Sequence, residues 1–356
     1  MVLFALAKDA RTIPRFSARY EQNCNLCHAN PTGGGLRNLY ATKFIIPEEL
    51  TRKRLDPEVL AGIQPDLTDN LLIGADLRTI HFYSDDEAKT LNFFQMQGDV
   101  YLNFQMGSKL SLYFDSGMSK KFELFGLGYY LPWNGYMKIG RFTPDYGWKF
   151  TDHTMFVREY LGFFFPPRHT DVGVEAGIYP GNLFITASVI NGNAGSTFDE
   201  NQKVGAIGRA GYRFNLFGAG FVLGGSGSTN PTSTAINDAA GGFWSFNWRG
   251  LTWLGEVDWT RENSEPGDNH TTGFVASNEI TYLFTQGLDM KATFDFDDPD
   301  WNFQTGSKNR YGGGGFCYLN PFVAFEVLVR YYDITQGADM PENNYWETIV
   351  QFHMMY

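Results

Sequence analysis

The sequence predicts an all-β transmembrane fold, an antiparallel barrel of about sixteen strands that follows a small N-terminal segment. Three observations indicate this fold. Aromatic residues make up 17% of the 356 residues and glycine contributes 40 of them, whereas only 19% of the residues are charged. Apolar and polar residues alternate along many segments after residue 66, as in strands whose two faces meet different surroundings. The connections between these segments alternate between short and long.

Composition also excludes several classes of protein. No stretch approaches the ~18–20 consecutive apolar residues that a membrane-spanning helix requires, so a helical membrane protein is excluded. The net charge of −11 argues against a nucleic-acid partner, because such partners attract basic proteins.

The first seven residues are similar to the end of an export signal. They read Met-Val-Leu-Phe-Ala-Leu-Ala, which resembles the apolar region and small-residue cleavage site of a secretory signal peptide without its basic start. We interpret residues 1–7 as a signal-peptide remnant that is cleaved near Lys8. The alternative is a short apolar N-terminus with no role in export.

Residues 8–66 carry the motif on which the functional prediction depends. Residues 24–28 read Cys-Asn-Leu-Cys-His, the C-x-x-C-H sequence by which c-type haem is attached. Cys24 and Cys27 would each form a thioether bond to the haem, and His28 would be the proximal iron ligand. The sequence thus predicts one covalent haem c in a segment exported from the cytoplasm. A chance match, a disulfide, a redox pair and a zinc site are the alternatives, and no second Cys/His pair completes a zinc site.

The second axial ligand has no candidate within this segment. No His or Met occurs between Ala29 and Ile80, and about sixty residues are few for shielding a large apolar ring. We therefore expect residues of the barrel to cover part of the haem. For the sixth ligand there are two possibilities: the barrel supplies it, or the position holds a weak ligand, water or nothing. The barrel candidates are His353, Met355, His153, His169 and His81. Any one of these histidines could instead be a hydrogen-bonding lumen residue.

Residues 67–356 contain about sixteen candidate strands. Their approximate positions are 70–83, 90–104, 108–117, 121–131, 134–143, 169–179, 182–191, 203–213, 215–226, 240–247, 250–262, 272–285, 287–297, 309–319, 321–333 and 345–356. Short turns such as 180–181 alternate with long polar connections such as 227–239. Bacterial outer-membrane barrels have even strand numbers, short periplasmic turns and long outer loops, so both termini are expected on the periplasmic side.

The final strand supports closure of the sheet. Apolar residues occupy every second position up to the terminal Tyr356, which resembles the recognition signal of bacterial outer-membrane barrels. In an open sheet this strand would be an exposed hydrophobic edge. Pairing with the first strand removes that edge. We therefore expect a closed barrel surrounded by outer-membrane lipid.

The predicted lumen has two notable features. The longest connection, about 144–168, resembles by its position the third loop of porins, which folds inward as a constriction. Strand phasing places Glu256, Asp258, Glu279, Asp289, Asp295, Asp297 and Glu326 inward, opposed by Lys291 and Arg330. Such an acidic lumen would favour cations.

Two stretches carry a resemblance to known families. The sequence Ile-Pro-Arg-Phe-Ser-Ala-Arg-Tyr at 13–20, followed by the motif at 24–28, resembles the N-terminus of the fused monohaem cytochrome c–porins, which include outer-membrane iron(II) oxidases. The barrel separately resembles the phosphate-selective O/P-type porins, in residues 140–142, 146–147, 158–159, 168–174 and 191–192. The acidic strand residues depart from the basic lumen that a phosphate porin requires.

The resemblance to the cytochrome–porins implies electron transfer across the outer membrane through one haem on the periplasmic side or in the lumen. It implies extracellular Fe(II) as donor and a periplasmic cytochrome as acceptor, and the chain would be an Fe(II)-oxidising cytochrome or an electron carrier. The opposite electron direction is chemically equivalent. One alternative is a solute-selective, cation-preferring porin whose haem is structural or sensory. Another is a barrel that sheathes a separate multihaem protein.

Overall fold

The computed structural model describes most of the chain. The described residues are 14–20, 22–52, 56, 58–59, 62–86, 92–118, 122–161, 170–192, 202–232, 235–264, 270–303, 306–335 and 344–356. The predicted signal remnant at 1–7 and the candidate ligand His169 lie outside these residues.

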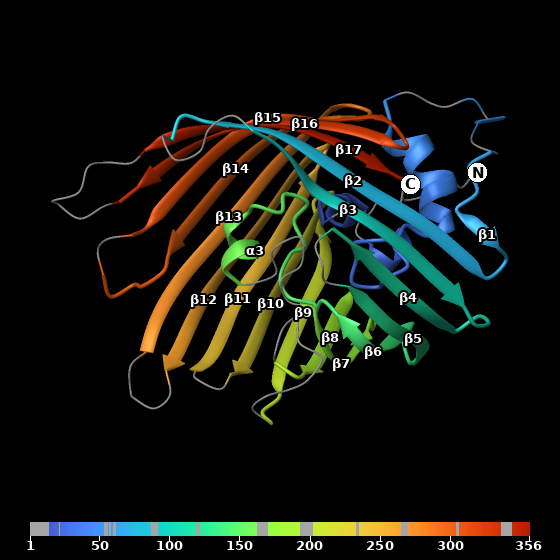
Figure 1. Ribbon diagram of the computed structural model, residues 1–356, viewed down its shortest axis with the longest axis horizontal. Helices are drawn as coiled ribbons and strands as arrows, with labels where there is room; N and C mark the ends of the chain where they lie inside the picture. The colour runs from blue at the N-terminus through green and yellow to red at the C-terminus, as the bar shows by residue number, and fades with distance from the viewer. Residues whose placement is uncertain are drawn as a thin grey trace.

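Sixteen antiparallel strands form a closed barrel (Figure 1). They are β2 (Leu71–Ser84), β3 (Asn92–Gln105), β4 (Leu110–Gly117), β5 (Glu123–Leu131), β6 (Gly135–Phe142), β7 (Asp171–Ile178), β8 (Leu183–Ile190), β9 (Gly205–Leu216), β10 (Ala219–Pro231), β11 (Ala235–Trp248), β12 (Leu251–Ser264), β13 (His270–Thr285), β14 (Leu288–Asp298), β15 (Lys308–Asn320), β16 (Val323–Ile334) and β17 (Tyr345–Met355). Pairing of β17 with β2, from Glu347 opposite Ser84 to Met355 opposite Asp76, closes the sheet. The prediction of a sixteen-stranded barrel is confirmed. A short strand, β1 (Asp66–Thr68), pairs with β2 before the barrel begins.

The two ends of the barrel differ in their connections. One end, where β2 begins and β17 ends (Figure 1), carries short turns such as 217–218, 249–250, 286–287 and 321–322. The other end carries longer connections, including 143–170, 191–204 and 299–307. The alternation predicted from the sequence is therefore present.

One predicted long connection is wrong. Residues 227–239 mostly extend the hairpin of β10 and β11, because β10 continues to Pro231 and β11 begins at Ala235. Ser228 pairs with Ala239 and Thr229 with Asp238. Backbone pairing does not require apolar side chains, so a polar sequence can prolong a hairpin, and its Ser, Thr and Asn residues concealed the strand.

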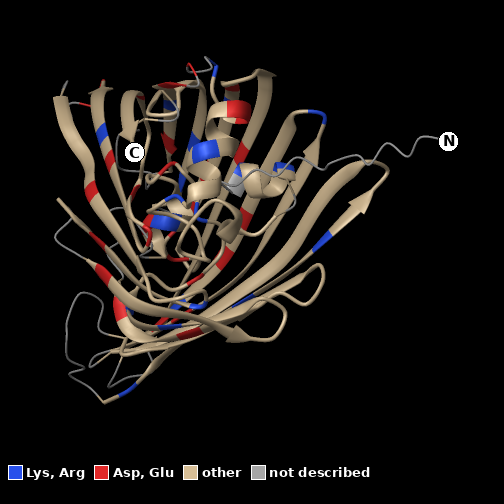
Figure 2. Cartoon of the chain, turned by 90° about the vertical axis from the view of Figure 1, so that its right-hand side faces the viewer, with Lys and Arg blue, Asp and Glu red and all other residues tan. Residues whose placement is uncertain are grey.

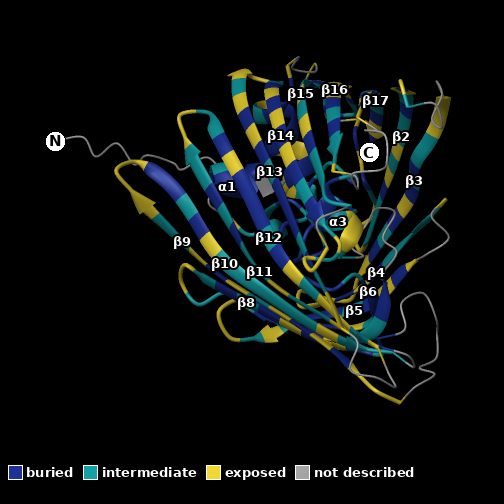
Figure 3. Ribbon diagram, turned by 90° about the vertical axis from the view of Figure 1, so that its left-hand side faces the viewer, coloured by how far each residue is buried: buried dark blue, intermediate teal, exposed yellow. Residues whose placement is uncertain are grey.

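The barrel wall has a polar inner face and an apolar outer face. Along β16, Glu326, Leu328 and Arg330 are buried, whereas Phe325, Val327 and Val329 are exposed. Similar alternating bands of buried and exposed residues run along the other strands (Figure 3). This period of two follows from the pleat, which points successive side chains to opposite faces.

Short helical segments accompany the strands. The N-terminal segment holds α1 (Pro14–Tyr20), the single turn η1 (Cys24–Leu26) and the helix η2 (Ala41–Leu50), and the connection after β6 holds α3 (Phe156–Tyr160). Helix α1 contacts β10, β11 and β12, and α3 contacts β12, β13 and β14. Both lie inside the ring of strands (Figure 3). No helix among the described residues has the length and apolar character needed to cross a membrane.

Candidate functional site

A cavity in the barrel lumen brings the predicted haem motif together with distant parts of the chain. Its lining includes Cys24, Cys27 and His28 from the N-terminal segment. The connection after β6 contributes another wall, mainly through residues between Gly147 and His153, and the strands β2, β3, β9, β15, β16 and β17 also contribute lining residues. The motif is therefore enclosed by barrel residues, as the small size of its own segment led us to expect.

Backbone hydrogen bonds fix the shape of the motif. The amides of Cys27 and His28 both donate to the Cys24 carbonyl, at 3.1 and 3.0 Å. This tight turn lets residues 24, 27 and 28 face the same cavity. The side-chain amide of Asn38 donates to the carbonyls of Asn25 and Leu26, at 3.0 and 2.8 Å. Asn38 thus holds the turn from outside the motif, a role that sequence reasoning missed.

The loop after the motif must contain glycine where it approaches Cys24. Gly33 has a φ of +82°, a conformation that other residues rarely adopt. A Cβ at this position would lie 3.2 Å from the sulfur of Cys24. At the end of the same loop, the Leu36 amide donates to the Tyr113 hydroxyl of β4 at 3.1 Å. The loop is therefore attached to the barrel wall while leaving the thiol uncovered.

The electrostatic setting of His28 favours its neutral form. Burial is the main cause that lowers the pKa of the His28 imidazole to about 4, and the nearby Arg37 guanidinium adds to the effect. The backbone of Gly35 and Leu36 opposes the shift in part. The neutral imidazole is the form that coordinates a metal, so His28 is available as a ligand near neutral pH.

The residues present fit a c-type haem. Cys24 and Cys27 are free thiols rather than a disulfide, and thioether formation requires free thiols. Apolar and aromatic side chains that could cover a porphyrin ring line the same cavity, namely Ile46, Leu50, Trp148, Phe150, Phe316 and Tyr318. The zinc alternative has no comparable support, because the described residues contain no group of three or more His, Cys, Asp or Glu suited to a metal ion.

Three of the candidate sixth ligands line this cavity. They are His153, His353 and Met355, and the inward direction predicted for His353 and Met355 is confirmed because both are buried. His81 does not line it. Its ring packs 4.5 Å from that of Phe93, which is 71% exposed, whereas its neighbour Ile80 is buried toward the lumen. His81 therefore faces outward and is removed as a candidate.

Arg78 of β2 links the two inner histidines. Its Nη1 lies 3.2 Å from His153 Nε2, and its Nε lies 3.3 Å from His353 Nε2. His353 Nε2 also lies 2.7 Å from an Asp76 oxygen. The third candidate, Met355, contacts the Arg37 guanidinium through its sulfur. Each candidate thus has a polar neighbour, and that contact would have to break before the candidate could bind the haem iron.

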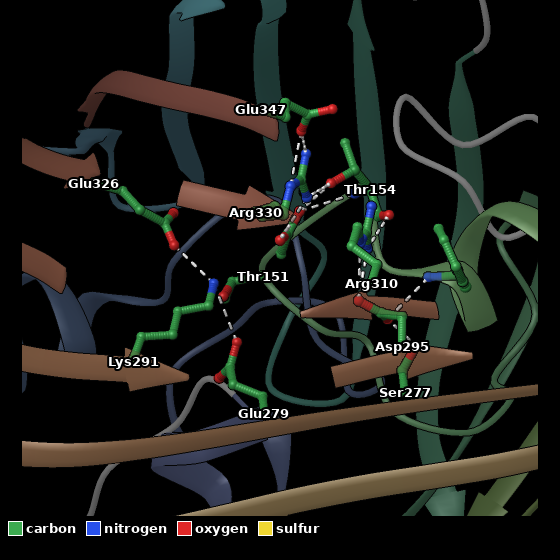
Figure 4. A network of polar contacts seen from close by, with 12 residues as sticks. Thr151, Thr154, Ser277, Glu279, Lys291, Asp295, Arg310, Glu326, Arg330 and Glu347 are labelled. Carbon is green, nitrogen blue, oxygen red and sulfur yellow. Dashed lines mark hydrogen bonds and ion pairs between the residues drawn. The ribbon is translucent and has the colours of Figure 1, made fainter. Parts of the chain in front are cut away.

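The lumen is an ion-pair network rather than an acidic tube. The inward directions predicted for the nine charged strand residues are confirmed, since all nine are buried. Figure 4 shows how several are paired: Lys291 lies between Glu326 and Glu279, at 2.7 and 3.3 Å, Arg310 binds Asp295 at 2.7 Å, and Arg330 binds Glu347. Basic and acidic residues both occur on the segments inside the barrel and on the strands around them (Figure 2).

The lining of the cavity contains more basic than acidic residues, which opposes the cation preference predicted from the strands. Its lining contains six basic residues, Arg15, Arg37, Arg78, Lys149, Arg158 and Arg209, and three acidic ones, Asp76, Asp145 and Glu326. Four of these basic residues come from the N-terminal segment and the connection after β6. Strand phasing alone could not show that these segments lie in the lumen.

The connection after β6 folds inward, as predicted. The Trp148 indole donates to the Trp244 carbonyl of β11 at 3.0 Å, and Lys149 Nζ bonds Thr32 of the motif loop at 3.1 Å. Further along, the Val157 amide donates to the Ser277 hydroxyl of β13 at 3.3 Å. These contacts make the connection a bridge between the motif segment and the barrel wall.

Comparison with known proteins supports the barrel. No protein-family model and no curated protein matches the sequence. Among solved structures, OprB of Pseudomonas putida is 10% identical with a TM-score of 0.61, covering 87% of this chain and 99% of its own. In-vitro folded OmpT of Vibrio cholerae is 11% identical with a TM-score of 0.60, covering 82% and 99%. The anion-selective porin from Comamonas acidovorans is 10% identical with a TM-score of 0.58, covering 80% and 99%. The chain therefore has the fold of the outer-membrane porins.

Proposed function

We propose that this chain transfers electrons across the outer membrane through a single c-type haem held in the barrel lumen. The observation that carries the proposal is that both thiols and the imidazole of the C-x-x-C-H motif line one lumen cavity, together with three side chains able to complete axial ligation. The donor would be extracellular Fe(II), and the acceptor a periplasmic cytochrome. Electrons could travel in the opposite direction by the same route.

The outer surface supports a membrane location. Large apolar side chains are exposed on strands around the barrel, among them Val100, Ile139, Val189, Leu223, Val327 and Met354. An apolar surface of this extent is unfavourable in water, at roughly 25 cal/mol per Å². In an outer-membrane barrel it forms the lipid-facing band, so lipid is the surrounding that this surface fits.

Each part of the site has a chemical role in this proposal. The haem would supply a one-electron couple. Cys24 and Cys27 would hold it covalently, and neutral His28 would bind its iron. The barrel and the connection after β6 enclose the cavity, which keeps bulk water from the reacting centre and reduces the polarity around it.

The lumen contents disfavour the hypothesis of a barrel that sheathes a separate multihaem protein. Helix α1 and the motif segment fill space that such a partner would need, since Arg19 binds Asp289 of β14 at 2.5 Å and Thr252 of β12 at 3.0 Å. Leu36 bonds Tyr113 on the opposite wall. The chain's own N-terminal segment therefore occupies the lumen.

A transfer assay in liposomes tests the proposal. Purified protein is inserted into liposomes that enclose an oxidised soluble cytochrome c, and Fe(II) is added outside. We expect the enclosed cytochrome to be reduced, and the variant Cys24→Ala/Cys27→Ala to lose both this activity and haem staining on a denaturing gel. Equal rates for the variant, or wild-type protein without covalent haem, would contradict the proposal.

A solute-selective porin is the second candidate function. The porin fold favours it, and the excess of basic residues around the cavity favours anions over cations as solutes. Conductance across a planar bilayer, with salts of different anion size, separates the two functions. Substantial anion current without haem-dependent electron transfer would favour this second function.

A further inference from the structure

Arg15 is a buried cation without a hydrogen-bond partner. Its side chain belongs to α1, lines the cavity that holds the motif, and is 1% exposed. All three guanidinium nitrogens are buried and have no hydrogen-bond partner among the described residues. Guanidinium carries five N–H donors, and an ionised group left unpaired in the interior is strongly unfavourable. Such a group points to a missing anionic ligand.

The nearby carboxylates are already used by other cations. The acidic residues whose charges act on Arg15 are Asp289, Glu279 and Glu326. Asp289 binds Arg19 at 2.5 Å, and Glu326 and Glu279 bind Lys291 at 2.7 and 3.3 Å. These carboxylates offset the positive charge of Arg15 at a distance without accepting its hydrogen bonds.

The position of the guanidinium is set by aromatic rings. Its carbon lies 4.6 Å from the ring centroid of Phe316 and 5.2 Å from that of Phe16. Cation–π contacts of this kind favour the charged form and leave the in-plane N–H donors available. Phe16 and Phe316 belong to the same apolar cluster as Cys27. The free donors and the haem-attachment thiol therefore adjoin one enclosed space.

We propose that Arg15 binds a propionate carboxylate of the haem, as a positioning residue for that group. This inference rests on the proposed function. Guanidinium binds carboxylate through two parallel hydrogen bonds, and a propionate attached to a haem in this cavity is presented at a high effective concentration. A free carboxylate or phosphate would have to reach a side chain that is almost fully enclosed.

Redox titration of the full-length protein tests the inference with the substitution Arg15→Gln. Loss of the cation leaves the propionate charge uncompensated, which stabilises the ferric state. We expect the ferrous-to-ferric stability ratio to fall about tenfold, a decrease of about 59 mV in midpoint potential for a one-electron couple. The potential should also become dependent on pH, because a propionate without its guanidinium partner can take up a proton. The other titratable groups that act on this position are Asp289, Glu279, Glu326 and Tyr318.

Two further variants separate pairing from general charge and from misfolding. Arg15→Lys keeps the positive charge and should retain most of the wild-type potential. Arg249→Gln removes an equal charge in the β11–β12 turn, outside the cavity lining, and should leave the potential unchanged.

Covalent haem staining and the circular-dichroism spectrum must match wild type for each variant. If Arg15→Gln does not retain haem, the comparison of Arg15→Lys with wild type under varied pH replaces it. A midpoint potential of Arg15→Lys lower by about 59 mV would then contradict simple charge pairing.

The outcomes distinguish this inference from the proposed function. Wild-type protein without covalent haem would overturn both. Covalent haem with an unchanged potential in Arg15→Gln would overturn the propionate assignment alone. Titration with acetate and phosphate tests whether the ligand is a free anion. If the midpoint potential of the wild type shifts with their concentration and that of Arg15→Gln does not, Arg15 binds a free anion instead.

Discussion

At the scale of the residue, Asn38 shows how a side chain outside the motif controls it. Its amide donates to two carbonyls of the motif turn, and its side-chain oxygen accepts from the Ala41 amide at 2.9 Å. Asn38→Ala would leave the two carbonyls without these donors, at a cost of about 1–3 kcal/mol. We expect a lower ratio of haem absorbance to protein in purified material.

The matched control is Asn302→Ala, which removes an exposed asparagine whose side-chain amide donates to Asp300 at 3.1 Å, far from the motif turn. This variant should keep the wild-type ratio. A full haem complement in Asn38→Ala would show that the turn forms without that side chain.

The sixth iron position gives a second prediction at this scale. His153, His353 and Met355 line one cavity with His28, so one of the three can complete axial ligation. Among His153→Ala, His353→Ala and Met355→Leu, we expect one to convert a low-spin absorption spectrum to a high-spin one while covalent haem is retained. His81→Ala, on the outer face, is the control. A low-spin spectrum in all three variants would exclude these residues as ligands.

At the scale of the element, the connection after β6 is held in the lumen by charge. Asp145 binds Arg209 of β9 at 3.0 Å. Burial alone would raise the pKa of the Asp145 carboxyl, but Arg209, Lys149 and Lys138 outweigh burial and keep this pKa below its ordinary value. An aspartate with a lowered folded pKa stabilises the fold at pH above its unfolded pKa of ~3.9, and this stability is lost as pH falls through the folded value.

Hydrogen exchange of the 143–161 backbone amides measures this contribution. We expect wild-type protection to persist from neutral pH to about pH 4 and to decrease below it. Asp145→Asn should lower protection already at pH 7, because it leaves Arg209 buried with a weaker partner, a loss of roughly 3–5 kcal/mol. Unchanged protection at pH 7 would mean that apolar packing alone holds the connection.

The sequence was most informative about the barrel strands. Period-two alternation in segments such as β14 and β16 predicted both their positions and their inward charges, because one face must meet lipid. The same rule did not recognise the extension of β10 to Pro231, where polar side chains pair beyond any apolar band. Strands whose two faces are both polar carry no alternation to detect.

The site was less predictable from sequence. The C-x-x-C-H spacing predicted Cys24, Cys27 and His28 as haem-attachment residues, since that chemistry depends on local spacing. Arg78 was missed because its contacts with His153 and His353 cross the lumen. Asn38 was missed because its bonds to the motif turn come from a residue more than ten positions after it. His81 was a candidate only by residue type: the alternation of β2 is unbroken around it, with Leu77 and Tyr83 exposed and Ile80 and Ser84 buried, and it places His81 on the outer face.

At the scale of the whole molecule, the even number of strands fixes the topology. The beginning of β2, the end of β17 and the short turns lie at one end (Figure 1), so the connection at 299–307 and the turn at Gly181 lie at opposite ends. A protease site inserted in 299–307 should be cleaved on intact cells, and one inserted at Gly181 should be cleaved only after the outer membrane is opened. The reverse pattern would contradict the orientation.

The last prediction concerns the N-terminal segment as an occupant of the lumen. Its contacts reach β4 through Leu36 and Tyr113, and β12 and β14 through Arg19. The sixteen strands close by their own pairing and do not require these contacts. Deleting residues 14–52 should therefore leave a folded barrel whose lumen is wider, and single-channel conductance in a planar bilayer should rise severalfold.

The control is Cys24→Ala/Cys27→Ala, which keeps the segment and should keep the low conductance. Equal conductance of the deletion and wild-type proteins would mean that the connection after β6, rather than the N-terminal segment, limits passage through the barrel.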